Sequence, residues 1–154
     1  MVQHITAARN YITCGRHHVS QGDAENATSC FMMAMSLAPN YPRSYQAMAQ
    51  LCIQHGRMRE ALIYYTKAVA LDPPQLDIAS ERAALLKDMG MINEAIASYQ
   101  QAIAINPSIP EFHVNLAGVY QDSGQHEAAL MYNMKALELR PDFPDALCNM
   151  VSML

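Results

Sequence analysis

PRSYQAMAQLCIQHGRMREALIYYTKAVALDPPQ, residues 42–75, is the stretch that decides the fold. It holds two series of apolar residues whose spacing places the side chains on one face of a helix. The first series is Tyr45, Met48, Ala49 and Cys52, and the second is Ala61, Leu62, Tyr65, Ala68, Val69 and Leu71. Gly56, between the two series, can take the left-handed backbone that closes a helix, and Pro73 cannot continue one. The stretch therefore predicts two helices joined by a tight turn.

The same pattern recurs every 34 residues along the chain. Five columns show it: Pro39, Pro73, Pro107, Pro141; Gly22, Gly56, Gly90, Gly124; Ala27, Ala61, Ala95, Ala129; Ala34, Ala68, Ala102, Ala136; and Leu37, Leu71, Ile105, Leu139. The columns predict repeats at 8–41, 42–75, 76–109 and 110–143, after a lead-in at 1–7 and before the first helix of an incomplete fifth repeat at 144–154. Because no stretch of useful length alternates as a strand does, we expect an all-α chain.

Two further columns indicate how the helices of the repeats pack against one another. The eighth position is always small: Gly15, Ala49, Ala83 and Ala117. The twenty-fourth position holds Phe31, Tyr65 and Tyr99 in the first three repeats. Small residues let two helices approach, and large ones fill the space between neighbouring repeats. We expect a right-handed superhelical solenoid of antiparallel helix pairs, with a concave and a convex side.

These columns resemble the tetratricopeptide repeat family over residues 8–154. The second repeat matches the family pattern with Tyr45, Met48, Ala49, Cys52, Gly56, Ala61, Tyr65, Ala68 and Pro73. Arg82 and Asn133 depart from the pattern, because they stand where an aliphatic and an aromatic residue are usual. The resemblance implies a module that binds a protein or an extended peptide in its concave groove.

Composition excludes several other classes of protein. The 154 residues carry 10 basic and 14 acidic side chains, only 16% of the chain, with no cluster of Lys and Arg for tracking phosphates. We therefore expect no nucleic acid as a partner. No apolar run approaches a membrane span, and the chain does not start like a signal peptide, so we expect no membrane association. The four cysteines form no C-x-x-C pair and are interpreted as reduced thiols in the cytoplasm or nucleus.

The resemblance places the peptide-binding positions on the first helix of each repeat. The candidate residues are Arg9, Arg16, Arg43, Gln46, Gln50, Glu81, Asp88, Asn115, Asp122 and Asn149. Residues 1–75 carry a net charge of +2 and residues 76–154 one of −6, so this face is predicted to run from basic to acidic and to orient a peptide of opposite polarity. The alternative is that these charges form an ordinary solvated helix face.

Asn115 and Asn149 are 34 residues apart on that face, and an Asn side chain can both donate to and accept from a peptide backbone. A coincidence of spacing is the alternative. The segments 115–124 and 140–149 resemble the last repeats of eukaryotic O-linked N-acetylglucosamine transferases. In that family the repeats present protein substrates, through concave asparagines, to a glycosyltransferase domain that follows. The resemblance implies that this chain is the substrate-recognition segment of such a protein, whose catalytic domain would lie downstream.

The sequence offers no catalytic motif of its own. No phosphate-binding Gly loop, G-x-S-x-G or H-E-x-x-H sequence occurs, and we expect neither an enzyme nor a cofactor. Cys14, His17 and His18 lie within one helical turn and could supply metal ligands. Because Cys14 occupies an aliphatic core position of the repeat and His18 an aromatic one, we interpret them as core residues and predict no metal site.

Two other functions stay open. A co-chaperone that captures C-terminal carboxylates needs Lys and Asn at positions that hold Ile12, Arg16, Ala47, Asp77 and Glu81 here. Two carboxylates facing the ligand's own would repel it, which argues against this function. A scaffold in another multiprotein assembly is the alternative function. The helix at 144–154 lacks a partner helix, so we also expect that two chains could associate through it.

Overall fold

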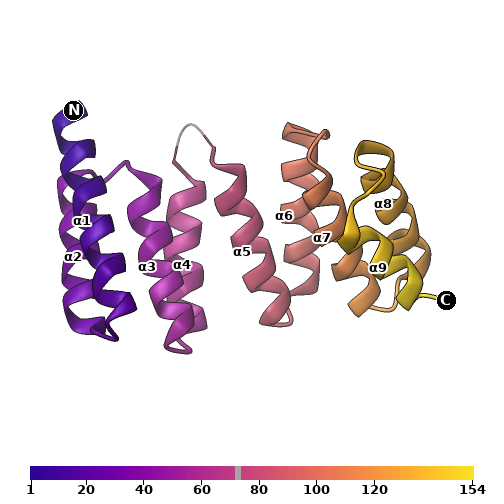
Figure 1. Ribbon diagram of the computed structural model, residues 1–154, viewed down its shortest axis with the longest axis horizontal. Coiled ribbons are helices and arrows are strands. Elements are labelled where there is room, and N and C mark those ends of the chain that lie inside the picture. Colours follow the sequence, from indigo (N-terminus) through magenta and orange to yellow (C-terminus); the bar gives the residue numbers. More distant parts are fainter. Residues whose placement is uncertain (72–73) are drawn as a thin grey trace. The chain divides into compact units, whose positions relative to one another are not determined.

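The computed structural model describes residues 1–71 and 74–154, which form nine α-helices and no strand (Figure 1). The helices are α1 (Val2–Ser20), α2 (Ala24–Leu37), α3 (Pro42–Gln54), α4 (Met58–Val69), α5 (Leu76–Asp88), α6 (Ile92–Ile105), α7 (Pro110–Asp122), α8 (His126–Leu139) and α9 (Pro144–Ser152). The predicted all-α class is confirmed for these residues. Asp72 and Pro73, the latter a member of the proline column, lie outside them.

The chain divides into two compact units, Met1–Ile78 and Ala79–Leu154. In the first unit α1 packs against α2 and α3 against α4, while both α1 and α2 also contact α3. In the second unit α7 packs against α6 and α8, and α9 contacts both α7 and α8. Within each unit, a helix pair therefore contacts the first helix of the pair that follows it, which is the packing of a helical solenoid.

The glycine column closes the first helix of each pair. At Gly56 the backbone has a φ of 72°, a conformation that favours glycine. The N–H of Arg57 then donates to the carbonyl of Cys52 at 2.8 Å, the bond that seals a helix end of this type. The other three glycines of the column have φ between 75° and 78° and the same bond beside them. The turns within all four pairs are thus alike.

The starts of the helices follow the repeat frame as well. Pro42, Pro110 and Pro144 lie in the first turn of α3, α7 and α9, where the missing N–H costs nothing. Asp23 caps α2 by accepting from the N–H of Asn26 at 3.1 Å. The first helix begins at Val2, so residues 2–7 of the predicted lead-in are part of α1.

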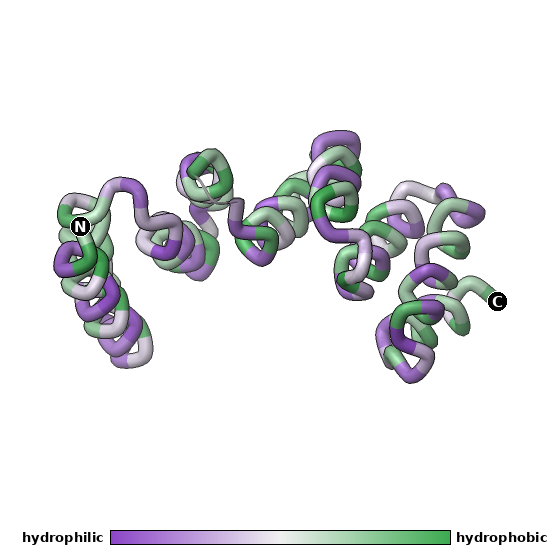
Figure 2. The backbone as a smooth tube through the Cα atoms, turned by 90° about the horizontal axis from the view of Figure 1, so that it is seen from above, coloured by the Kyte–Doolittle hydropathy of each residue, from purple (hydrophilic) through white to green (hydrophobic). Residues whose placement is uncertain are grey.

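The two alanine columns form the centre of the core. Every residue in them is at most 2% exposed. Hydrophobic and hydrophilic residues alternate along each helix, as packing on one face requires (Figure 2). Phe31, Tyr65 and Tyr99 are buried at the twenty-fourth position, and a Cβ added to Gly15 would lie only 2.4 Å from Cε1 of Phe31. In the first repeat, the ring of Phe31 therefore leaves little room for a side chain at position eight.

Asn133, which replaces the aromatic residue in the fourth repeat, is completely buried. Its Oδ1 accepts from Nδ2 of Asn149 at 3.4 Å, and its own Nδ2 has no hydrogen-bond partner among the described residues. The departure from the pattern thus places an amide in the core, beside one of the predicted peptide-binding residues.

Candidate functional site

On the first unit, α1 and α3 enclose a shallow hollow of about 180 Å³. Its lining residues come from the first three helices: Arg16, Val19, Phe31, Ala47, Gln50, Leu51 and Gln54. Two of the predicted binding residues, Arg16 and Gln50, therefore lie at one place, Arg16 on α1 and Gln50 on α3. Arg16 is exposed and forms no ion pair among the described residues. This hollow offers a cation and amides above an apolar floor.

Arg43, by contrast, is committed to neighbours within its own unit. One nitrogen of its guanidinium donates to Asp77 and to Oε1 of Gln46, and the other donates to Oε1 of Gln75 at 3.1 Å. Burial raises the pKa of Asp77, but the hydrogen bond and charge of Arg43, together with hydrogen bonds from the N–H groups of Ile78 and Asp77, outweigh it and hold this pKa below its usual value. Gln46 is only 5% exposed, so its amide serves this network and does not face solvent.

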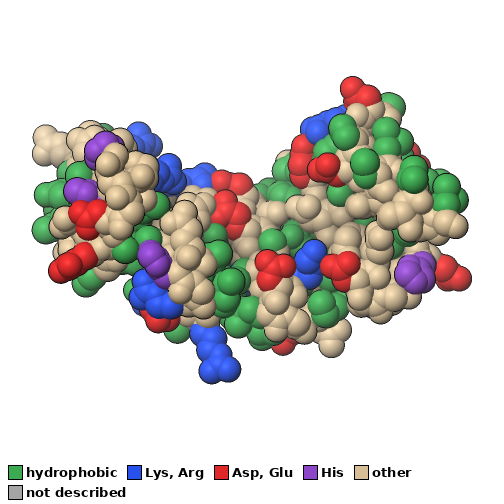
Figure 3. Space-filling view, turned by 60° about the horizontal axis from the view of Figure 1, so that its bottom comes forward, with side chains coloured by type: hydrophobic (Ala, Val, Ile, Leu, Met, Phe, Trp, Pro, Cys, Tyr) green, Lys and Arg blue, Asp and Glu red, His purple; other side chains and the backbone are tan. Residues whose placement is uncertain are grey.

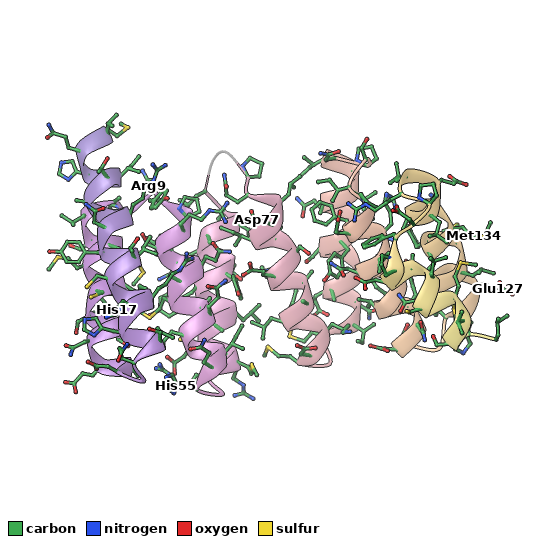
Figure 4. All side chains as sticks on the ribbon, in the orientation of Figure 1. Arg9, His17, His55, Asp77, Glu127 and Met134 are labelled. Atoms are coloured by element: carbon green, nitrogen blue, oxygen red, sulfur yellow. The ribbon has the colours of Figure 1, made fainter. Side chains whose placement is uncertain are left out.

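Arg9 is engaged in the same unit as well. Its Nε donates to the hydroxyl of Tyr41 at 3.2 Å, and its guanidinium lies over the Tyr41 ring with 5.8 Å from Cζ to the ring centroid. Figure 4 shows Arg9 on the first helix and Asp77 at the start of α5. Of the three predicted cationic contacts in the first unit, only Arg43 has a carboxylate partner among the described residues, while Arg9 is held by Tyr41 and Arg16 forms no ion pair.

On the second unit, a larger hollow of about 330 Å³ contains both candidate asparagines. Its lining residues are Ala84, Lys87, Tyr99, Val114, Asn115, Gly118, Asp145, Cys148 and Asn149. Nδ2 of Asn115 donates to Oγ of Ser80 at 3.3 Å, and Nδ2 of Asn149 donates to Oδ1 of Asn133 at 3.4 Å. Both bonds are long, and within the described part of the chain neither Oδ1 of Asn115 nor Oδ1 of Asn149 accepts a hydrogen bond.

The charges around this hollow are of both signs. Nζ of Lys87 lies 3.2 Å from Oδ2 of Asp122, which joins the first helices of two successive pairs. Asp88 and Asp145 are exposed, whereas Glu81 is half-buried and takes part in an interaction with another residue. Figure 3 shows basic and acidic side chains scattered in small groups over the face that it displays. Part of the acidic charge of this half is neutralised by ion pairs, as at Asp122 and Glu111.

Comparison with known proteins agrees with this architecture. The family described as "Tetratricopeptide repeat" matches residues 42–75 and 110–143, and the one described as "TPR repeat" matches residues 83–124. Together these matches span more than half of the chain. The chain belongs to the tetratricopeptide repeat family. It is thus a protein-interaction module by family, and the two matches of the first family have the same limits as the second and fourth predicted repeats.

Solved structures share this repeat fold at low sequence identity. YrrB, "a TPR protein with an unusual peptide-binding site", superposes with a TM-score of 0.78 and 21% identity over 94% of this chain and 75% of its own. The pilF protein of Pseudomonas aeruginosa superposes with a TM-score of 0.84 and 21% identity, over 99% of this chain and 69% of its own. MamA of Desulfovibrio magneticus superposes with a TM-score of 0.79 and 18% identity, over 96% of this chain and 83% of its own. No curated protein sequence matches the chain significantly. The resemblance to one transferase family therefore gains no support from these comparisons.

Outside the hollows, the repeats carry two features that the sequence analysis missed or misread. Cys14 is exposed, so its interpretation as a core residue is wrong; the core positions of this part of α1 are Ile12 and Gly15. An apolar patch covers the outer side of α8, with Leu130, Met131 and Met134 between 41% and 50% exposed (Figure 4 labels Met134). The spacing of these residues at i, i+1 and i+4 was the available signal. In the described residues, no helix has the length and apolarity to cross a membrane.

Proposed function

We propose that this tetratricopeptide repeat chain binds an extended peptide, with the hollow around Asn115 and Asn149 as the main contact of the second unit. One observation carries the proposal: two asparagines that are one repeat apart line the same hollow, each with an unused carbonyl oxygen. A peptide lying across α7 and α9 could donate backbone N–H groups to both oxygens. The published description of YrrB as a peptide-binding TPR protein supports this function for the fold.

The internal bonds of the two asparagines fit such a role. Asn115 is held by a hydrogen bond of 3.3 Å to Ser80, and Asn149 by one of 3.4 Å to Asn133. Both bonds use only the amide nitrogen, so the carbonyl oxygen of each side chain stays available to a ligand. Binding then requires little reordering of these side chains, which reduces the entropic cost of association. Val114 gives this hollow an apolar surface, and Gly118 leaves open space for a ligand because no atom lies within 4 Å of its Cβ position.

A narrower form of this proposal names the ligand as Ser/Thr-rich segments of proteins that are modified by an O-linked N-acetylglucosamine transferase-like protein. The resemblance of segments 115–124 and 140–149 to that family supports it, because both asparagines fall in these segments. Such a role would place the chain in the cytoplasm or nucleus. A scaffold role in another assembly is the outcome if Ser/Thr-rich peptides are not preferred.

The test is a fluorescence anisotropy titration with a fluorescein-labelled Ser/Thr-rich peptide and a composition-matched peptide without Ser or Thr. Each hydrogen bond lost between the chain and the peptide ligand costs roughly 0.5–1.5 kcal/mol. The double variant Asn115→Ala with Asn149→Ala should therefore weaken binding roughly 5- to 150-fold. Asn93→Ala is the matched control, because Asn93 is exposed on α6, the second helix of its pair. Equal affinity of the double variant and the wild type would refute the site. Equal affinity of both peptides would refute only the narrower form.

Self-association through residues 144–154 stays a prediction. Leu147 and Val151 are 45% and 68% exposed and lie four residues apart on one face of α9. Light scattering over a range of protein concentrations tests it: a mass that rises with concentration in the wild type, and not in Val151→Asp, would support association. A constant monomer mass would rule it out.

A further inference from the structure

The helix pair α1–α2 brings together three metal-ligating side chains that are spread over seventeen residues of sequence. The thiols of Cys14 and Cys30 and the imidazole of His18 each place one ligand atom within 4.8 Å of the other two. Cys14 and His18 are four residues apart and so share one face of α1, and Cys30 reaches them from α2. His17, the neighbour considered in the sequence analysis, is exposed and does not belong to the group.

We propose that Cys14, His18 and Cys30 form a binding site for a zinc ion. In a tetrahedral zinc site, with Zn–S of about 2.3 Å and Zn–N of about 2.0–2.1 Å, the ligand atoms lie about 3.5–3.8 Å apart. The three ligand atoms, which lie within 4.8 Å of one another, are thus at most about 1.3 Å farther apart than a zinc ion requires. Two thiolates and one imidazole form a donor set that suits zinc and disfavours magnesium and calcium. Water takes the fourth position.

A carboxylate lies beside one nitrogen of the imidazole, which leaves the other nitrogen, Nε2, for the ion. Oδ2 of Asp23 lies 3.4 Å from Nδ1 of His18. A carboxylate beside a metal-bound histidine fixes the ring and increases its basicity. Asp23 is also the N-cap of α2 and its Oδ1 is held by the N–H of Asn26, so the position of this carboxylate is set by the fold. The second half of α1, the turn and the middle of α2 therefore all contribute to the site.

Accessibility favours exchange with a metal in solution. Cys14 is exposed, while Cys30 and His18 are half-buried, so an ion can enter without any opening of the core. Binding replaces the two thiol protons by the ion, and these protons go to solvent. The site is independent of the proposed peptide contact at Asn115 and Asn149, because it lies in the other compact unit.

The experiment uses the full chain, reduced and stripped of metal with a chelator, and Co²⁺ as a spectroscopic probe for zinc. We expect one Co²⁺ per chain, with thiolate-to-cobalt charge-transfer absorption and the visible bands of a tetrahedral ion, and displacement of cobalt by an equivalent of Zn²⁺. Cys14→Ser is the decisive variant, because an exposed residue can be replaced without a cavity in the core. It should abolish the charge-transfer band of one sulfur and weaken Zn²⁺ binding at least about tenfold.

Matched variants separate the site from general effects. Cys148→Ser removes another exposed thiol and His17→Gln the neighbouring imidazole, and both should bind as the wild type does. Asp23→Asn keeps the helix cap and should weaken zinc binding roughly 10- to 100-fold. The proposal is overturned if the reduced wild type gives no thiolate–cobalt absorption, or if Cys14→Ser leaves it unchanged. It is also overturned if the two thiols form a disulfide in air while the reduced chain takes up no metal.

Discussion

Gly15 and Gly118 provide a matched test of how tightly the helix pairs are packed. Both are in the interior of a first helix, so replacement by Ala should gain about 0.8–1.0 kcal/mol from helix propensity in either place. A Cβ at Gly118 has nothing within 4 Å, whereas a Cβ at Gly15 would lie 2.4, 2.8 and 3.0 Å from three atoms of the Phe31 ring. The ring is 1% exposed, so it is packed among neighbouring side chains.

The expected energies follow from these distances. Overpacking of a buried site costs about 1–3 kcal/mol. Gly118→Ala should therefore stabilise the chain by about 1 kcal/mol, while Gly15→Ala should range from neutral to about 2 kcal/mol destabilising. At about 2–4 °C per kcal/mol for a chain of this size, Gly15→Ala should melt roughly 2–12 °C below Gly118→Ala.

Thermal unfolding followed by far-ultraviolet circular dichroism measures the difference. Phe31→Leu, made in the wild type and in Gly15→Ala, completes a double-mutant cycle. A smaller side chain at position 31 should remove the penalty of Ala at position 15. If Gly15→Ala and Gly118→Ala raise the melting temperature equally, the close approach of α1 to Phe31 does not constrain the packing and the reasoning fails.

Three further predictions concern the core and one ion pair. Ala95→Leu should lower the free energy of unfolding by about 1–3 kcal/mol, because it overpacks a buried site. Ala97→Leu, at an exposed position of the same helix, should lower it by less than about 0.5 kcal/mol. Urea unfolding measures both values, and equal effects would contradict the assigned core face. Asn133→Leu should raise stability by about 1 kcal/mol, because it removes a buried amide nitrogen without a partner, and a loss of stability would mean that the amide is satisfied. The pKa of Asp77 is lowered in the folded chain by Arg43, so the pair stabilises the fold above the unfolded pKa of about 3.9 and this contribution disappears as the pH falls through the lowered value. Because the Asp77 side chain is 55% exposed, Asp77→Asn should cost under about 1 kcal/mol at neutral pH and nothing in acid, and a cost that persists in acid would exclude the ion pair as its cause.

The helix pairs themselves could be predicted from the sequence because their signals are local. A glycine that requires positive φ and a proline in the first turn each act within a few residues. The structure ends a helix beside each of the four column glycines and begins one at Pro42, Pro110 and Pro144. Buried alanines were equally predictable, since close helix approach repeats with the frame.

The state of the candidate site residues was less predictable, because it depends on partners one repeat away. Arg43 and Asp77 occupy the same position in successive repeats, and their opposite charges were the signal that the two would pair. The approach of Cys30 to Cys14 depends on how α1 and α2 face each other, which spacing within one helix does not reveal. Asn133 shows the same limit, because its partner Asn149 belongs to the following helix.

The identical closure of the four turns also bears on how the chain reaches its native state. Each closing bond joins residues only five apart, as between Arg57 and Cys52, so it can form before any other repeat has ordered. Short-range closures of this kind favour rapid folding. Any of the four hairpins could then serve as a nucleus, with order spreading outward to its neighbours.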